Sequence, residues 1–308
     1  MQVSIIGNHI SVGFFIFLIG SFVIGVAATI LQVVLNLYLT VCRIGKTTAL
    51  QRQMIGGTSN SIGMAIAPLV ISYLIFHGTP LHDIVTKQFI IPLIILILIM
   101  LIITLLVGKT QMPSIDNVRQ APGEKFDKSV WSFRNLKLGV WGIFFYVGIE
   151  VAVGANVNMY ASELGGSFAS NATHMAALYW GLLLLGRFLG SFIKQVPSEK
   201  QLVIASIGAI VLLVLAMLTA NPWILTLIGF FHSIMWPAIF TLATDQLGKY
   251  TTKASGVLTM GVIGGGIIPL LQGIFADVMG GNWLWTWLLV IAGEAYILYY
   301  GLNGYKQH

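Results

Sequence analysis

Charged residues are scarce in this chain. They make up 8% of its 308 residues, whereas a soluble globular domain carries about 25%. Hydrophobic residues make up 57% of the sequence, and the mean hydropathy is +0.89. So little charge cannot cover the surface of a soluble domain. The composition therefore excludes that class and indicates an integral membrane protein.

Cysteine and catalytic motifs are also nearly absent. The single cysteine, Cys42, has no partner for an intrachain disulfide, and we interpret it as an inert small residue. The sequence has no HExxH, no GxSxG, no P-loop and no GxGD-type aspartate pair within an apolar run. Glu150 and Glu294 lie inside apolar runs but lack a defined nucleophile or metal-ligand set. We therefore predict no enzyme activity, no cofactor and no metal site.

Apolar runs of about 20 residues fill most of the chain, and each is long enough to cross a bilayer as a helix. Nine runs can be placed, at 12–40, 54–76, 88–108, 138–161, 172–194, 201–220, 223–244, 255–278 and 283–303. The pattern predicts an all-α integral membrane fold with nine spans.

The distribution of lysine and arginine predicts the orientation in the membrane. One set of connections and the C-terminal tail hold 14 of the 16 basic residues, whereas Lys87 alone lies in the opposite loops and Arg187 lies within a span. The 14 are Arg43, Lys46, Arg52, Lys109, Arg119, Lys125, Lys128, Arg134, Lys137, Lys194, Lys200, Lys249, Lys253 and Lys306. This side, with the C-terminus, should face the cytoplasm. The net charge of +6 is thus explained by topology, and we predict no nucleic-acid partner.

Nine spans would place Met1 outside, yet the first ten residues lack a basic segment and a cleavage site of the secretory type. We therefore expect upstream helices to be missing from this chain. A polar stretch with mixed charges, 109–134, follows the third span and is interpreted as a cytoplasmic linker. The predicted organisation is three helices of an N-terminal bundle in 1–108, the linker in 109–134, and a six-helix bundle in 135–308.

Residues 233–277 are two apolar spans joined by a short basic loop. Pro237 interrupts the first span, and Gly264, Gly265, Gly266 and Pro269 interrupt the second. Backbone groups freed by such residues need protein or water partners, and broken helices at mid-membrane are where secondary transporters build substrate sites. The segment favours a transporter. Ordinary close packing of helices at the glycines is the alternative.

The order and spacing of several motifs carry a resemblance to a known family. They are GVAATILQVVLNLYLT (25–40), NSIGMAIAP (60–68), FYVGIEVAVG (145–154), YWGLLLLGRFLGS (179–191), the 233–277 segment and YYGLNGYK (299–306). With these motifs the chain resembles the fucose permease and glucose/galactose transporter group of the major facilitator superfamily. The resemblance implies a two-bundle helical transporter of twelve spans, of which these nine would be the fourth to the twelfth. It also implies a monosaccharide substrate, symport with a cation (a proton in preference to sodium) and the inner membrane.

Polar residues inside the N-terminal spans are the first candidates for substrate binding, because each costs free energy in lipid. Gln32 and Asn36 are four residues apart and share a helical face, and their amides can donate to and accept from sugar hydroxyls. The resemblance places them on a helix that lines the sugar cavity, and it matches Asn60 to a family asparagine. An interhelical hydrogen bond for the first two, and a helix cap for Asn60, are the alternatives.

Glu150 is the strongest single candidate. An acid at this depth needs protonation or a hydrogen-bonding partner, so it could bind sugar hydroxyls, exchange a proton, or belong to a buried structural pair. Asn158 is two turns from Glu150 and shares its face better than Asn156 does.

The C-terminal spans supply further candidates. Trp236, beside Pro237, could stack on a sugar ring, and His232 lies one turn earlier. Gln272 is a weaker candidate for substrate binding. Arg187, near the inner end of its span, is assigned a structural or gating role. Glu294 has no family counterpart that we can match, and Trp283, Trp285 and Trp287 are interpreted as interfacial anchors.

Three departures from the family pattern weaken the expectation of proton coupling. Gln32 stands where proton-coupled fucose permeases carry an acid, Leu37 replaces a proline, and Gly57 replaces a glutamine. The residues do not decide between glucose, galactose and fucose. A channel, a transporter of another solute, and a non-functional fragment remain the alternative functions.

Overall fold

The computed structural model describes residues 12–42, 45–70, 90–111 and 126–307. Within these ranges the chain is built from helices and turns, without a β-strand. The all-helical prediction is therefore confirmed, and each predicted span corresponds to a helix or a pair of consecutive helices among the described residues.

The first three helices are α1 (Val12–Val41), α2 (Ala49–Leu69) and α3 (Ile90–Lys109). Helix α2 begins earlier than predicted because Thr48 and Gln51 form a capping box. The backbone N–H of Gln51 donates to the Thr48 hydroxyl, and the backbone N–H of Thr48 donates to the side-chain oxygen of Gln51. Residues 71–76 and 88–89 of the predicted spans lie outside the described residues.

The chain continues through α4 (Arg134–Leu164), the short α5 (Gly166–Ser170), α6 (Ala172–Gly190), α7 (Ser198–Thr219) and α8 (Pro222–Thr244). Helix α8 begins sharply because the Asn221 side chain accepts from the N–H of Trp223, while Pro222 occupies the first helical position, where an N–H has no helical partner. Pro237 lies inside α8 without ending it.

The span predicted at 255–278 is two helices. A 3₁₀ turn, Gly261–Ile263, separates α9 (Thr251–Met260) from α10 (Gly264–Val278). An added Cβ at Gly264 would overlap the carbonyl oxygen of Phe144 on α4, whereas one at Gly266 would meet nothing within 4 Å. Close helix packing, the alternative given above, therefore explains Gly264.

The last span consists of a 3₁₀ turn (Leu284–Thr286), α11 (Trp287–Tyr299) and a π-helical turn (Tyr300–Gly304). Trp285 is exposed, in keeping with an interfacial side chain. Trp287 is fully buried, and its ring centroid lies 5.9 Å from that of Tyr160. The interfacial interpretation is wrong for Trp287, because this side chain fills the interior between α4 and α11.

Six of the described segments are long and apolar enough to cross a membrane: Phe15–Val41, Ile90–Lys109, Arg134–Leu164, Ser198–Thr219, Pro222–Thr244 and Gly248–Val278. Helices α2, α6 and α11 correspond to the other predicted spans, and they are shorter or carry more polar side chains.

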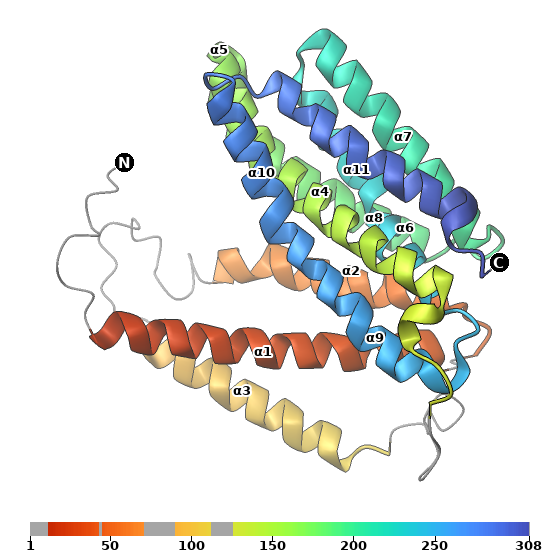
Figure 1. Cartoon of the computed structure of the whole chain (residues 1–308). Helices are drawn as coiled ribbons and strands as arrows, with labels where there is room; N and C mark the ends of the chain where they lie inside the picture. Colours follow the sequence, from red (N-terminus) through yellow and green to blue (C-terminus); the bar gives the residue numbers. More distant parts are fainter. Residues whose placement is uncertain (1–11, 43–44, 71–89, 112–125, 308) are drawn as a thin grey trace.

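Figure 1 shows α1, α2 and α3 on one side of the molecule and α4, α6, α7, α8, α10 and α11 on the other, with α9 beside the end of α1. The core lies in the second group, where α4 packs against α6, α8, α10 and α11. Helix α2 packs on α6 and α8, and α1 packs on α9. The apolar side chains of α3 and of residues 15–26 of α1 point outward, as expected for side chains that face lipid.

The described helix ends that carry basic residues, among them those of α4, α6, α7 and α9, lie at the same end of the molecule as the C-terminus (Figure 1). Lys249 pairs with Asp127 at 3.1 Å, and Arg134 donates to the carbonyl oxygens of Asn303 and Lys306. Arg43, Lys87, Arg119 and Lys125 lie outside the described residues, as does 112–125 of the predicted linker. The cytoplasmic orientation of this end and the three-part division of the chain stay predictions.

Candidate functional site

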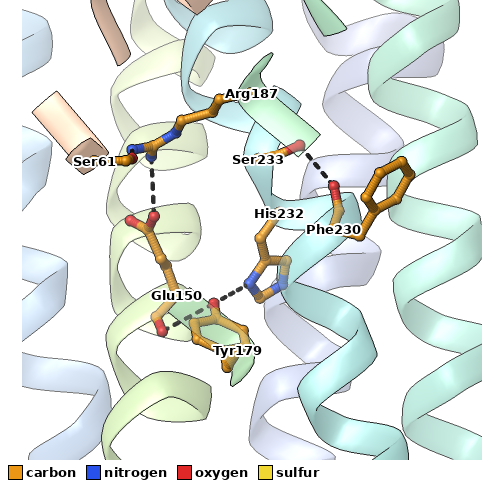
Figure 2. Close-up of polar contacts among 7 residues, drawn as sticks. All are labelled: Ser61, Glu150, Tyr179, Arg187, Phe230, His232 and Ser233. Carbon is orange, nitrogen blue, oxygen red and sulfur yellow. Dashed lines mark hydrogen bonds and ion pairs between the residues drawn. The ribbon is translucent and has the colours of Figure 1, made fainter. Parts of the chain in front are cut away.

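Arg187 of α6 connects three helices through its guanidinium group (Figure 2). One terminal nitrogen donates to the Ser61 hydroxyl of α2 at 2.7 Å, and the other lies 3.2 Å from Glu150 Oε1 of α4. The side chains of Arg187 and Glu150 are only 11% and 13% exposed. The buried pair weighed for Glu150 from the sequence is thus present, and a partly exposed carboxylate remains within reach of a ligand.

Gly57 leaves room for this arginine. A Cβ at position 57 would lie 3.2 Å from the Cδ atom of Arg187, closer than side chains normally pack. A longer residue here would push the guanidinium away from Ser61. The structure therefore gives a physical reason for glycine where the family pattern has glutamine.

A second polar chain begins at the backbone of Glu150. The Tyr179 hydroxyl of α6 donates to the Glu150 carbonyl oxygen at 3.1 Å and lies 2.6 Å from Nδ1 of His232 on α8 (Figure 2). On the other side of the imidazole, His232 Nε2 lies 2.6 Å from Glu294 Oε1 of α11. Tyr179, His232 and Glu294 are each 0% exposed. Glu294 is thus one half of a buried pair.

Hydrogen bonds link the first group of helices to the second at three places in the described residues. Besides Arg187–Ser61, the Gln51 amide donates to the Ser191 carbonyl at 2.9 Å, and the Ser255 hydroxyl donates to the Val33 carbonyl at 3.0 Å. All three use polar groups within or next to apolar helices. Because such bonds can open and reform as a unit, they are suited to a contact that changes during a transport cycle.

The N-terminal candidates lie close to this contact. Gln32 is half-buried and Asn36 is buried on α1, and the Asn36 carbonyl oxygen accepts from Gln53 on α2 at 2.9 Å. Asn60 is exposed on α2, next to Ser61. Their roles as sugar ligands stay predictions.

Two amides beyond Glu150 on α4 have different surroundings. Asn156 donates to Gln272 Oε1 at 2.9 Å, and Gln272 in turn donates to the Thr286 hydroxyl at 3.0 Å. The Asn158 side-chain oxygen is buried without a hydrogen-bond partner in the part of the chain that the structure describes. Asn158 therefore keeps an unused acceptor, whereas both ends of the fully buried Gln272 amide are engaged within the protein.

Aromatic rings lie beside the two polar chains. Trp236 is half-buried, stacks on Phe240 with 6.1 Å between centroids, and lies 6.5 Å from Tyr146. Tyr146 is also 6.2 Å from the His232 ring, and its hydroxyl lies near Glu150 and Arg187 without reaching hydrogen-bond geometry.

Sequence reasoning did not single out Tyr146, Tyr179 or Ser61 as site residues. Tyr146 precedes Glu150 by four residues, a spacing that places both on one helical face and could have identified it. No local signal identifies Tyr179 or Ser61, because each acquires its role from a side chain on another helix.

Buried charges and amides in apolar helices, joined across two groups of helices, are typical of a polytopic membrane transporter. The sequence profile of the Major Facilitator Superfamily matches residues 3–269. This chain belongs to that superfamily, and it is therefore a multi-pass membrane transporter and not an enzyme.

Three similar proteins illustrate the relationship. The "Glucose/galactose transporter" of Brucella abortus biovar 1 (strain 9-941) is 34% identical over 301 residues, which are 95% of this chain and 72% of the relative. The "L-fucose-proton symporter" of Escherichia coli (strain K12) is 27% identical over 292 residues, 86% of this chain and 66% of the relative. The crystal structure of the transporter FucP in the outward conformation covers 94% of this chain and 76% of its own, with a TM-score of 0.80 at 23% identity, which shows a common fold.

Proposed function

We propose that this protein carries a monosaccharide of the glucose, galactose or fucose type across the inner membrane by alternating access, in symport with a cation. The names of the relatives support a sugar substrate, and the name of the fucose relative supports a proton in preference to sodium. The C-terminus faces the cytoplasm in this proposal, as the distribution of basic residues suggests.

The observation that carries the proposal is the Ser61–Arg187–Glu150 contact, in which Arg187 bonds to both other side chains. A partly exposed carboxylate can accept hydrogen bonds from two adjacent sugar hydroxyls. A ligand that engages Glu150 competes with Arg187 for its carboxylate. Loss of that pairing also frees the guanidinium that holds α6 to Ser61 on α2. Sugar binding and separation of the two groups of helices are coupled in this way.

The proposed substrate site extends from Glu150 along neighbouring faces. Trp236 offers a flat ring to the C–H face of a sugar, with the fully buried Tyr146 packed behind it, and Asn158 offers its unused acceptor. Gln32, Asn36 and Asn60 supply polar groups from α1 and α2. Gln272 is a more distant member, reached only if its bonds to Asn156 and Thr286 open. Arg187 has the gating role.

The test is uptake of labelled glucose, galactose and L-fucose by membranes that contain the protein expressed from its own gene. Glu150→Gln should abolish accumulation, because the amide cannot pair with Arg187 as a carboxylate does. Glu163→Gln, which changes an exposed acid on the same helix, is the matched control and should accumulate sugar normally.

Replacing one partner of a buried ion pair costs about 3–5 kcal/mol, so the amount of each variant in the membrane must be measured alongside uptake. If Glu150→Gln is poorly produced, Glu150→Asp keeps the charge on a shorter side chain and should lower the apparent affinity. Wild-type uptake of none of the three sugars would refute the substrate class. Unchanged uptake in both Glu150 variants would refute the site.

A further inference from the structure

The His232–Glu294 pair has no part in the site proposed above. The two side chains come from α8 and α11, their polar atoms are 2.6 Å apart, and both are 0% exposed. A buried ionisable group is costly in a membrane unless it is paired, and such groups usually mark an ion or proton pathway. The number of protons on this pair follows from counting the hydrogen-bond donors in the series of contacts from Glu150 through Tyr179 and His232 to Glu294.

The Tyr179 hydroxyl has a single hydrogen but two close neighbours. The Glu150 carbonyl oxygen, 3.1 Å away, can only accept, so the hydroxyl hydrogen is used there. The 2.6 Å contact between the same hydroxyl and His232 Nδ1 then needs a hydrogen on Nδ1. With both contacts made, His232 carries a proton on Nδ1.

The other imidazole nitrogen requires one more proton. A neutral histidine protonated on Nδ1 has an acceptor at Nε2, and a carboxylate is also an acceptor. Their 2.6 Å contact therefore needs a proton on either Nε2 or Glu294. The Oε2 atom of Glu294 is buried without a hydrogen-bond partner in the described chain. This environment disfavours the state in which Glu294 is ionised and the proton between it and His232 is lost.

We propose that the His232–Glu294 pair binds the coupling proton, and that Tyr179 transmits its protonation to α4 at Glu150. The inference rests on the proposed cation symport and names the site of the cation. Gln32 on α1 cannot gain or lose a proton, and in this proposal His232 on α8 and Glu294 on α11 do so in its place.

Release of the proton rearranges the hydrogen bonds in a defined way. The Nδ1–H bond of His232 breaks and its proton goes to water, while the proton between Nε2 and Glu294 is kept on Nε2, which leaves a neutral His232 that donates from Nε2 to the Glu294 carboxylate. Nδ1 then becomes an acceptor, so the Tyr179 hydrogen turns from the Glu150 carbonyl to Nδ1. Deprotonation thus removes one hydrogen bond between α6 and α4, next to the residue proposed to bind sugar.

The proton on the His232–Glu294 pair sets the net charge of the buried region around it, and that charge affects which conformation is favoured. From the packed helices, Tyr146 and Glu150 of α4 and Tyr179 and Arg187 of α6 face it. Arg187 and Glu150 neutralise each other, so the region is neutral with the proton and carries one net negative charge without it. An uncompensated buried charge favours a state in which water reaches it. The other titratable side chains on the packed helices lie toward the helix ends or bond elsewhere: Arg52, Arg134, Lys137, Tyr160, Glu163, His174, Glu199, Lys200, Lys253, Tyr296 and Tyr300.

The first test compares gradient-driven accumulation with sugar exchange in proteoliposomes. Glu294→Gln mimics the protonated acid, because its amide donates to His232 Nε2 and keeps the proton on Nδ1. We expect loss of accumulation and of sugar-dependent proton uptake, with exchange of labelled for unlabelled sugar retained and insensitive to pH. His232→Gln should lose proton uptake as well, and Glu163→Gln should behave as wild type.

Two outcomes of this test overturn the inference. If Glu294→Gln takes up protons with sugar as the wild type does, the pair is not the proton site. If Glu294→Gln is present in the membrane but has lost exchange together with accumulation, the pair is a structural cross-link. If the wild-type protein moves no sugar at all, the proposed function fails, and the second measurement decides the inference separately.

That second measurement needs no transport. The ¹⁵N spectrum of histidine-labelled protein, with the His232 signals assigned by their loss in His232→Gln, reports which ring nitrogens are protonated. Raising the pH should change His232 from a form protonated on Nδ1 to one protonated only on Nε2, and Glu294→Gln should abolish that change. A wild-type His232 that keeps the same protonated nitrogens across the pH range at which the protein stays folded would overturn the proposal.

Discussion

Replacing Ser61 with alanine removes the hydroxyl that ties α2 to Arg187 on α6. The lost hydrogen bond is 2.7 Å long, buried and made to a charged donor. Bonds of this kind contribute about 1.5–3 kcal/mol. Because about 1.4 kcal/mol is tenfold in an equilibrium constant, the variant should increase the population of states with α2 and α6 separated by about 10- to 100-fold.

Alkylation of a buried cysteine measures that population. Met54 of α2 is fully buried where α2 meets α6 at Gly190. In the variant Met54→Cys, made in a Cys42→Ser background, the new thiol reacts with a maleimide only when α2 and α6 separate. The rate should rise by the same factor in Ser61→Ala. Ser59→Ala is the matched control, because Ser59 is exposed and, within the described chain, its hydroxyl donates to the Ile55 carbonyl oxygen of its own helix. An unchanged rate in Ser61→Ala would refute the role of the contact in holding the helices together.

Three further predictions concern packing and polar satisfaction, and each is measured by thermal unfolding in detergent. Gly264→Ala should destabilise the protein by about 1–3 kcal/mol, because its Cβ overlaps the Phe144 carbonyl, whereas Gly266→Ala should be neutral; equal effects would contradict the close approach. Gln272→Leu should cost about 1–3 kcal/mol by leaving buried hydrogen-bond partners unsatisfied, and full stability would mean that those bonds are not made. Gly57→Gln should displace Arg187, so a Ser61→Ala change added to it should have little further effect; additive effects would show that position 57 does not act through the arginine.

The helices could be predicted from the sequence, but their contacts could not. Apolar runs locate the spans because each helix must bury its backbone polar groups within itself in lipid. The division of 251–278 at Gly261 and the burial of Trp287 depend on α4, which packs against both segments. Local periodicity carries no information about which helix lies opposite.

The same limit applies to the site. Glu150 could be identified because an acid in an apolar run needs a partner, but its partner, Arg187, is 37 residues away, and Glu294 is 62 residues from His232. Those pairings depend on helix packing. Gly57 is a departure from the family pattern in the sequence and acquires a reason only once Arg187 lies against it.

Counterflow in proteoliposomes tests the central claim most directly. Liposomes that contain the purified wild-type protein are loaded with unlabelled glucose, galactose or L-fucose and diluted into a trace of the labelled sugar. A carrier that exposes one site alternately to each side predicts a transient accumulation of label above the outside concentration for at least one sugar. Entry of label that only approaches equilibrium, as through a channel, or no entry at all, would contradict the account.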